Sequence, residues 1–137
     1  NCSLGLSQLS KIDKFMKKRK YIFKLYNKNL KSLGKKIVLP KQVFNQESAN
    51  HLYIITLDSK YLRISRDQLI QKLFKVGIIS QVHYIPITNQ PFYKKFYKEK
   101  FSNANFYFKN AISLPIHVNL KENDIQYICK KIKKFLN

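Results

Sequence analysis

Three histidines are the side chains of this sequence best suited to proton transfer or ligand binding, and their surroundings differ. His83 lies in the middle of a predicted strand, within Gln81-Val-His-Tyr-Ile-Pro. His51 begins another predicted strand and His117 lies in a predicted loop, so we expect both to be solvated. Because side chains alternate along a strand, His83 and Tyr84 would lie on opposite faces. From the residues alone, His83 fits a ligand-binding role and a structural role equally well.

The sequence indicates no other familiar catalytic arrangement. Three separate glycines cannot form a phosphate-binding loop, and seven scattered carboxylates disfavour a paired acid and base. Lys60, next to Ser59, would need burial to act as a Schiff-base lysine, and a turn at the end of a strand is the simpler interpretation. Cys2 and Cys129 lack metal-ligand spacing, so we expect two buried, reduced thiols.

The charge balance raises nucleic-acid binding as an alternative function. The 137-residue chain has 27 Lys and Arg against 7 Asp and Glu, a formal charge of +20, together with 9 Tyr and 10 Phe. This composition fits a small stand-alone, lysine-rich module that binds RNA or DNA. However, only Arg19, Arg63 and Arg66 are arginine, the residue that base-edge and bidentate phosphate contacts favour. Codons rich in A and T offer a second explanation for the lysine.

Length and hydropathy disfavour a membrane protein. The length fits one domain, and a hydrophobic content of 45% is enough for a packed core. No apolar run approaches the roughly 18–20 residues that a membrane-spanning helix needs. Lysine faces would suit an anionic membrane surface, but the apolar faces opposite them are better used in a core. Because the first residues also lack a signal peptide, we expect a cytoplasmic protein with no membrane partner.

Hydrophobic periodicity predicts an α/β domain in which helices pack on one face of a small sheet. A long amphipathic helix is expected over Ser3–Leu33, ended by Gly34, and residues 35–50 fit a loop. Stretches rich in β-branched and aromatic side chains predict three strands, at His51–Leu57, Ile78–Ile85 and Ile112–Ile116.

Further helices are expected between and after these strands. Ser65 and Gln68 have the spacing of a capping box, so a helix should begin there and end at Gly77. A short irregular helix is predicted at 90–97 and another helical turn at 104–110. The helix after Ser65 should bury Leu69, Ile70, Leu73 and Phe74. The last helix should bury Ile125, Ile128, Cys129, Ile132 and Phe135.

Six stretches carry a family resemblance, in order, along nearly the whole chain. They are Leu4-Gly-Leu-Ser-Gln-Leu, the His51-Leu-Tyr-Ile strand, Ser65-Arg-Asp-Gln-Leu-Ile, Gln81-Val-His-Tyr-Ile-Pro-Ile, Gln90-Pro-Phe-Tyr, and Asn103-Ala followed by Ala111-Ile-Ser-Leu-Pro-Ile. Together they resemble the C-terminal part of DegT/StrS-type sugar-nucleotide aminotransferases, which are pyridoxal 5'-phosphate (PLP) enzymes of the type I aminotransferase fold. The His-Tyr and Gln-Pro pieces are most similar to the branch that makes UDP-4-amino-4,6-dideoxy-N-acetyl-β-L-altrosamine. That sugar is an intermediate of pseudaminic acid, which is used on bacterial surfaces and flagella.

The resemblance implies that this chain is one part of a longer protein whose two domains have different roles. Residues 1–34 would be the helix that leaves a large N-terminal domain, and residues 35–137 the small C-terminal domain. In the family the large domain holds the aldimine lysine, the acidic partner of the pyridine nitrogen and the phosphate-binding residues. We expect these upstream of Asn1, with an Asn-Tyr-Arg segment that reaches the partner subunit, so this chain would contain no catalytic residue and be inactive alone. The parent would be a homodimer that moves an amino group from glutamate to the 4-keto carbon of a UDP-sugar.

The resemblance also implies which side chains contact the substrate. In the family, the strand that matches His83 and Tyr84 faces the sugar-nucleotide cleft, so we assign both residues to substrate binding. Gln90 and Tyr93 are further substrate-binding candidates, although aromatic packing explains Tyr93 equally well. No cofactor-binding or metal-binding residue and no specific nucleic-acid partner is expected in this chain.

Two positions depart from the family pattern. Thr88-Asn89 stands where relatives of this branch often have His-Leu, and this difference bears on which sugar is bound. Lys121 stands where they often have Thr at the start of the last helix, so Asn119 is expected to cap that helix. Without the large domain, the chain would expose one face of its first helix, and we expect self-association or poor solubility.

Overall fold

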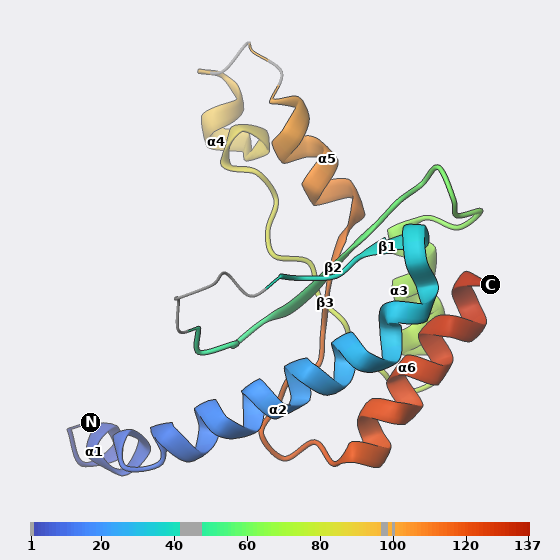
Figure 1. The fold of residues 1–137 in the computed structure, drawn as a ribbon. Coiled ribbons are helices and arrows are strands. Elements are labelled where there is room, and N and C mark those ends of the chain that lie inside the picture. Colours follow the sequence, from blue (N-terminus) through green and yellow to red (C-terminus); the bar gives the residue numbers. More distant parts are fainter. Residues whose placement is uncertain (1, 42–47, 97–98, 100) are drawn as a thin grey trace.

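The computed structural model describes residues 2–41, 48–96, 99 and 101–137, and confirms the predicted α/β fold. Its centre is a three-stranded antiparallel sheet in the order β1 (Ile37–Val38), β2 (Tyr53–Leu57) and β3 (Ala111–Leu114) (Figure 1). The α-helices are α1 (Cys2–Leu9), α2 (Ile12–Leu30), α3 (Arg66–Phe74), α4 (Pro91–Lys94), α5 (Ser102–Asn110) and α6 (Glu122–Leu136). Two 3-10 helices, η1 (Lys31–Lys36) and η2 (Ile87–Asn89), complete the described elements.

The strand register separates a core face of the sheet from a second face. Ile55 pairs with Ile112, and Tyr53 pairs with Leu114. These four side chains are buried and belong to one hydrophobic cluster with residues of α2, α3 and α6. The Tyr53 ring stacks on Tyr26 of α2, with 4.6 Å between the ring centroids. Because side chains alternate along β3, Ser113 lies on the face opposite this cluster.

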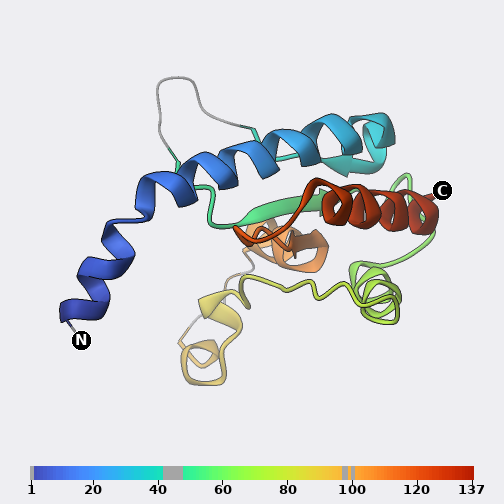
Figure 2. The same ribbon diagram turned by 90° about the horizontal axis from the view of Figure 1, so that it is seen from below.

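The long first helix predicted over Ser3–Leu33 is in fact two helices. The chain bends between α1 and α2, and Figure 2 shows the two helix axes diverging. The Ser10 hydroxyl donates to the carbonyl of Ser7 at 3.0 Å, a local bond that competes with helix continuation. No residue of α1 is buried, so packing does not hold it in line with α2. For the same reason Cys2 is exposed, contrary to prediction, whereas Cys129 is buried, and both are free thiols.

Two of the three predicted strands are close to the observed ones, and one is wrong. β2 and β3 match the first and third predictions, and β3 ends before Pro115, which cannot donate to a ladder. The predicted strand Ile78–Ile85 forms only an isolated bridge between Gln81 and Ser113. Its composition favours a strand, but tertiary pairing decides whether one forms. The predicted loop at 35–50 contains β1, and residues 42–47 of it lie outside the described residues.

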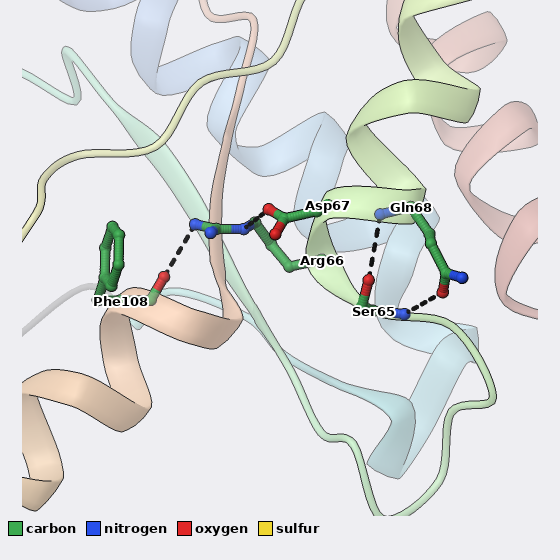
Figure 3. A network of polar contacts seen from close by, with 5 residues as sticks. All are labelled: Ser65, Arg66, Asp67, Gln68 and Phe108. Carbon is green, nitrogen blue, oxygen red and sulfur yellow. Dashed lines mark hydrogen bonds and ion pairs between the residues drawn. The ribbon is translucent and has the colours of Figure 1, made fainter.

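Helix α3 begins with the predicted capping box and adds an arginine anchor (Figure 3). The Ser65 hydroxyl accepts from the backbone N–H of Gln68 at 3.2 Å, and the Gln68 side chain accepts from the Ser65 N–H at 2.8 Å. Arg66 Nη1 donates to the carbonyl of Phe108 in α5 at 2.8 Å. Because α5 runs directly into β3, this bond fixes the helix that leads into an edge strand of the sheet. Phe74, predicted to be buried, is exposed.

The last helix buries most of its predicted face, but its cap differs from the prediction. Ile125, Ile128, Cys129 and Ile132 are buried, and Phe135 is half-buried. The helix begins at Glu122, after Lys121 rather than after Asn119. The Asp124 carboxylate accepts from the Lys121 N–H at 2.7 Å, which satisfies one free donor at the helix start. In the described part of the chain, no helix is long and apolar enough to cross a membrane.

Candidate functional site

A cleft of about 400 Å³ lies at the C-terminal end of β3. Its walls come from α2, from the residues just before β2, from the segment after α3 and from the turn that follows β3. Aliphatic side chains line part of it. The polar side chains that line it are Arg19, His51, Gln81, His83, Ser113 and His117. Segments distant in sequence therefore meet at one cleft that is lined by both polar and aliphatic side chains.

Backbone and tyrosine hydrogen bonds hold the walls of the cleft together. The bridge between Gln81 and Ser113 consists of two N–H to carbonyl bonds, of 3.1 and 2.8 Å, and it fixes the segment that carries His83 against β3. The hydroxyl of Tyr26, a fully buried residue of α2, donates to the carbonyl of Pro115 at 2.7 Å. The position of the turn after β3 therefore depends on a hydrogen bond within the core.

His83 lines the cleft as a half-buried side chain in contact with the second face of the sheet. Its Nδ1 lies 2.7 Å from Ser113 Oγ, so one ring nitrogen is engaged within the protein. Within the described part of the chain, Nε2 makes no hydrogen bond and is the ring atom left for a ligand. A histidine held at one nitrogen by a second group has a fixed ring orientation, which suits recognition of a hydroxyl or oxyanion.

His117 lines the same cleft and has a defined tautomer. The backbone N–H of Asn119 donates to His117 Nδ1 at 3.2 Å, so Nδ1 accepts and the proton of the neutral ring is on Nε2. His117 and His51 are exposed, as the sequence predicted. Their convergence on one cleft was not predicted, because it depends on the turn after β3 lying beside the residues that precede β2.

Arg19 is the functional candidate that sequence reasoning missed. It lines the cleft from α2, and its Nε is buried without a hydrogen-bond partner in the described structure. The available signal was its type: Arg19 stands between Lys18 and Lys20 in a chain that otherwise uses lysine almost throughout. Amphipathic periodicity held a second signal, because Arg19 comes three residues after Met16 and four before Phe23, on the apolar stripe of the helix, whereas Lys18 and Lys20 lie on other faces.

The cleft does not fit PLP as its resident group. No lysine and no carboxylate belongs to its described lining, whereas an aldimine and a pyridinium partner require them. Lys60 lies in an exposed turn after β2, as predicted. Among the residues that the structure describes, no group of three or more His, Cys, Asp or Glu side chains could hold a metal ion. The lining can donate hydrogen bonds and attract anions, but its described residues include no amine that could form an imine with a carbonyl.

The four predicted substrate-binding residues are not brought together. His83 lies in the cleft, and Tyr84 beside it is 74% exposed, with its ring edge-on to His83 at 4.7 Å between centroids. Gln90 caps α4, and its carbonyl accepts from the N–H of Lys94 at 2.8 Å. The Tyr93 ring packs edge-on against its neighbour Phe92. Figure 1 shows α4 beyond the N-terminal end of β3, whereas the residues that line the cleft lie around the C-terminal end of this strand.

Comparison with known proteins gives a consistent family match. Residues 1–133 match the DegT/DnrJ/EryC1/StrS aminotransferase family. A UDP-4-amino-4,6-dideoxy-N-acetyl-β-L-altrosamine transaminase from Campylobacter jejuni is 31% identical over 97% of this chain and 37% of its own length. The chain thus spans about a third of the length of the curated relatives that it matches.

Solved structures agree with this match. PseC of Helicobacter pylori, an aminotransferase of pseudaminic acid biosynthesis, superposes with a TM-score of 0.87 at 30% identity, covering 97% of this chain and 36% of that one. A putative sugar aminotransferase from Streptococcus pneumoniae, solved in its PLP-form, gives a TM-score of 0.82 at 31% identity, covering 97% of this chain and 34% of that one. The comparisons give no support to the nucleic-acid-binding alternative.

Proposed function

We propose, from the premise that this chain belongs to the DegT/DnrJ/EryC1/StrS aminotransferase family, that it supplies the substrate-binding cleft of a sugar-nucleotide aminotransferase. The observation that carries the proposal is the cleft at the end of β3, where Ser113 holds His83 Nδ1 at 2.7 Å. This cleft belongs to a domain that superposes on sugar aminotransferases. A fixed imidazole beside neutral and cationic donors suits a ligand that carries hydroxyl and anionic groups.

The proposed reaction moves an amino group from glutamate to a UDP-4-keto-6-deoxy-sugar in pseudaminic acid biosynthesis. Support comes from the Val-His-Tyr-Ile-Pro sequence around His83 and from the altrosamine transaminases and PseC among the relatives. An identity near 30% supports the shared aminotransferase reaction, and the choice of sugar rests on the motif around His83. His83 would donate or accept a hydrogen bond at the sugar or diphosphate, with Tyr84 beside it at the cleft margin.

The proposed PLP enzyme would be longer than this chain and would be a cytoplasmic homodimer. Residues 1–34 would then pack on a large domain that holds PLP and the aldimine lysine, and residues 35–137 would form the small domain. Helix α1 supports this arrangement because Leu4, Leu6 and Leu9 are all exposed on it. Several exposed leucines on one short helix are expected where another domain packs on it. Gln90 and Tyr93, which lie outside the cleft, would contact the substrate only if such a domain extends over α4.

The proposal is tested by steady-state kinetics of the polypeptide encoded by the complete reading frame. His83→Ala removes one hydrogen bond to the sugar nucleotide, so we expect its KM to rise by about tenfold, while the KM for glutamate changes little. Ser113→Ala should give a smaller rise, because it frees the ring without removing it. Gln71→Ala, an exposed α3 change outside the cleft lining, is the matched control. Equal kinetics for His83→Ala and the control would refute the assignment.

A further inference from the structure

Arg66 is a buried arginine, whereas Arg19 is half-buried with its Nε fully enclosed, and the two differ in how this donor is satisfied. Arg66, 9% exposed, donates Nε to Asp67 at 2.7 Å and Nη1 to the carbonyl of Phe108 at 2.8 Å. Arg19 Nε is also buried, yet no described residue accepts a hydrogen bond or forms an ion pair with it. A buried donor without an acceptor is unfavourable, and such groups in native proteins commonly have a partner that the chain itself does not supply.

The surroundings of Arg19 restrict what that partner can be. The described residues that line its cleft include no Asp and no Glu, so nothing in the cleft neutralises the guanidinium. His51, His83 and His117 share the cleft, and the His117 tautomer leaves Nε2–H as a second donor. Donors and a fixed positive charge with no anion nearby attract an oxyanion rather than a cation.

The size of the cleft favours a small molecule over a single ion. About 400 Å³ lies within the range of cavities that hold small ligands, and its aliphatic wall would contact the uncharged part of such a ligand. A guanidinium presents several N–H groups in one plane, which matches two oxygens of a phosphoryl or carboxylate group.

We propose that the cleft is an oxyanion-binding site in which Arg19 is the principal ligand and His117 a second donor. This inference deepens the proposed function and rests on it only for the origin of the ligand. The oxyanion is either the diphosphate of the nucleotide sugar or a carboxylate of the amino donor. Arg19 would then determine affinity for the charged part of a substrate, while His83 contacts a neighbouring group.

The test is NMR titration of the polypeptide encoded by the complete reading frame with inorganic pyrophosphate, UDP and glutamate in separate experiments. At about 0.15 M salt, we expect one oxyanion class to shift the Arg19 Nε–Hε resonance. Binding of pyrophosphate and UDP identifies a phosphoryl site, whereas binding of glutamate alone identifies a carboxylate site. Failure of all three at millimolar concentration, or binding that leaves this resonance unmoved, would overturn the proposal.

Variants separate the site from the general attraction of a chain with a charge of +20. Arg19→Gln should weaken Kd at least tenfold, Arg19→Lys by less because it keeps the charge, and His117→Ala by several-fold. Arg63→Gln removes the same charge from an exposed position and should leave Kd unchanged. If Arg19→Gln and Arg63→Gln weaken binding equally, the attraction is nonspecific and the proposal is wrong. Transaminase activity of the complete polypeptide is measured in a separate assay. A refuted oxyanion site would therefore not refute the proposed aminotransferase function.

Discussion

Replacing Arg66 by methionine should destabilise the fold substantially, although the residue lies in a helix at the edge of the core. The change keeps much of the aliphatic volume and removes the guanidinium. The hydrogen bond to the Phe108 carbonyl is charge-assisted and part-buried, a class worth about 1.5–3 kcal/mol. The ion pair with Asp67 adds about 0–1 kcal/mol, because Asp67 is 71% exposed. The guanidinium also lies 5.3 Å from the centroid of the Phe108 ring, a contact worth about 0.5–1 kcal/mol.

Together these contacts predict a loss of about 2–5 kcal/mol, since methionine leaves the Phe108 carbonyl without its partner. Urea unfolding followed by circular dichroism measures the loss directly as a lower midpoint with an unchanged slope. Arg66→Lys should fall between wild type and Arg66→Met, because it keeps the charge but not the forked geometry shown in Figure 3. Arg63→Met, at an exposed position, is the matched control. A change below about 0.5 kcal/mol for Arg66→Met would refute the view that this residue anchors α5 and β3.

Two further predictions concern the buried tyrosines and thiol behind the cleft. Burial raises the pKa of Cys129 to about 12, and those of Tyr26 and Tyr53 also rise. The folded state therefore holds these protons more tightly than the unfolded chain does. The free energy of unfolding is fully retained below about pH 9 and should fall as pH rises towards 12, by about 1.4 kcal/mol per group and pH unit. Urea unfolding at a series of pH values measures this, and a flat profile between pH 8 and 11 would contradict it. Tyr26→Phe leaves the Pro115 carbonyl without its hydrogen bond and should lower the free energy of unfolding by about 1–3 kcal/mol in the same assay. A shifted amide resonance at His117 would report movement of the turn. Unchanged stability would argue against a contribution from the tyrosine hydrogen bond.

Local signals in the sequence were sufficient for elements whose stability is itself local. The capping box at Ser65 and Gln68 and the β-branched and aromatic composition of β2 needed no knowledge of distant residues. The break near Ser10 was missed because an apolar stripe continues through it. No residue of α1 is buried by the described residues, so packing among them does not keep the helix straight. The segment Ile78–Ile85 has strand composition, but it pairs with β3 at one position only.

The cleft was predicted only in part, because it forms between segments that are far apart in sequence. His83 was identified through a motif, whereas Arg19 and His117 join it only after α2 and the turn following β3 have packed together. The lack of a described hydrogen-bond partner at Arg19 Nε depends on the three-dimensional surroundings of this atom, so residue type alone was a weak indication of it.

The central claim is that this chain belongs to an enzyme that aminates a nucleotide sugar, and 2-oxoglutarate release tests it most directly. The polypeptide encoded by the complete reading frame would be mixed with PLP, glutamate and a UDP-4-keto-6-deoxy-sugar. We predict that 2-oxoglutarate accumulates beyond one equivalent of the cofactor only when the keto sugar is present, and that this excess equals the amino sugar formed. A folded, PLP-loaded polypeptide that releases no 2-oxoglutarate with any nucleotide-linked 4-keto sugar would contradict the proposed function.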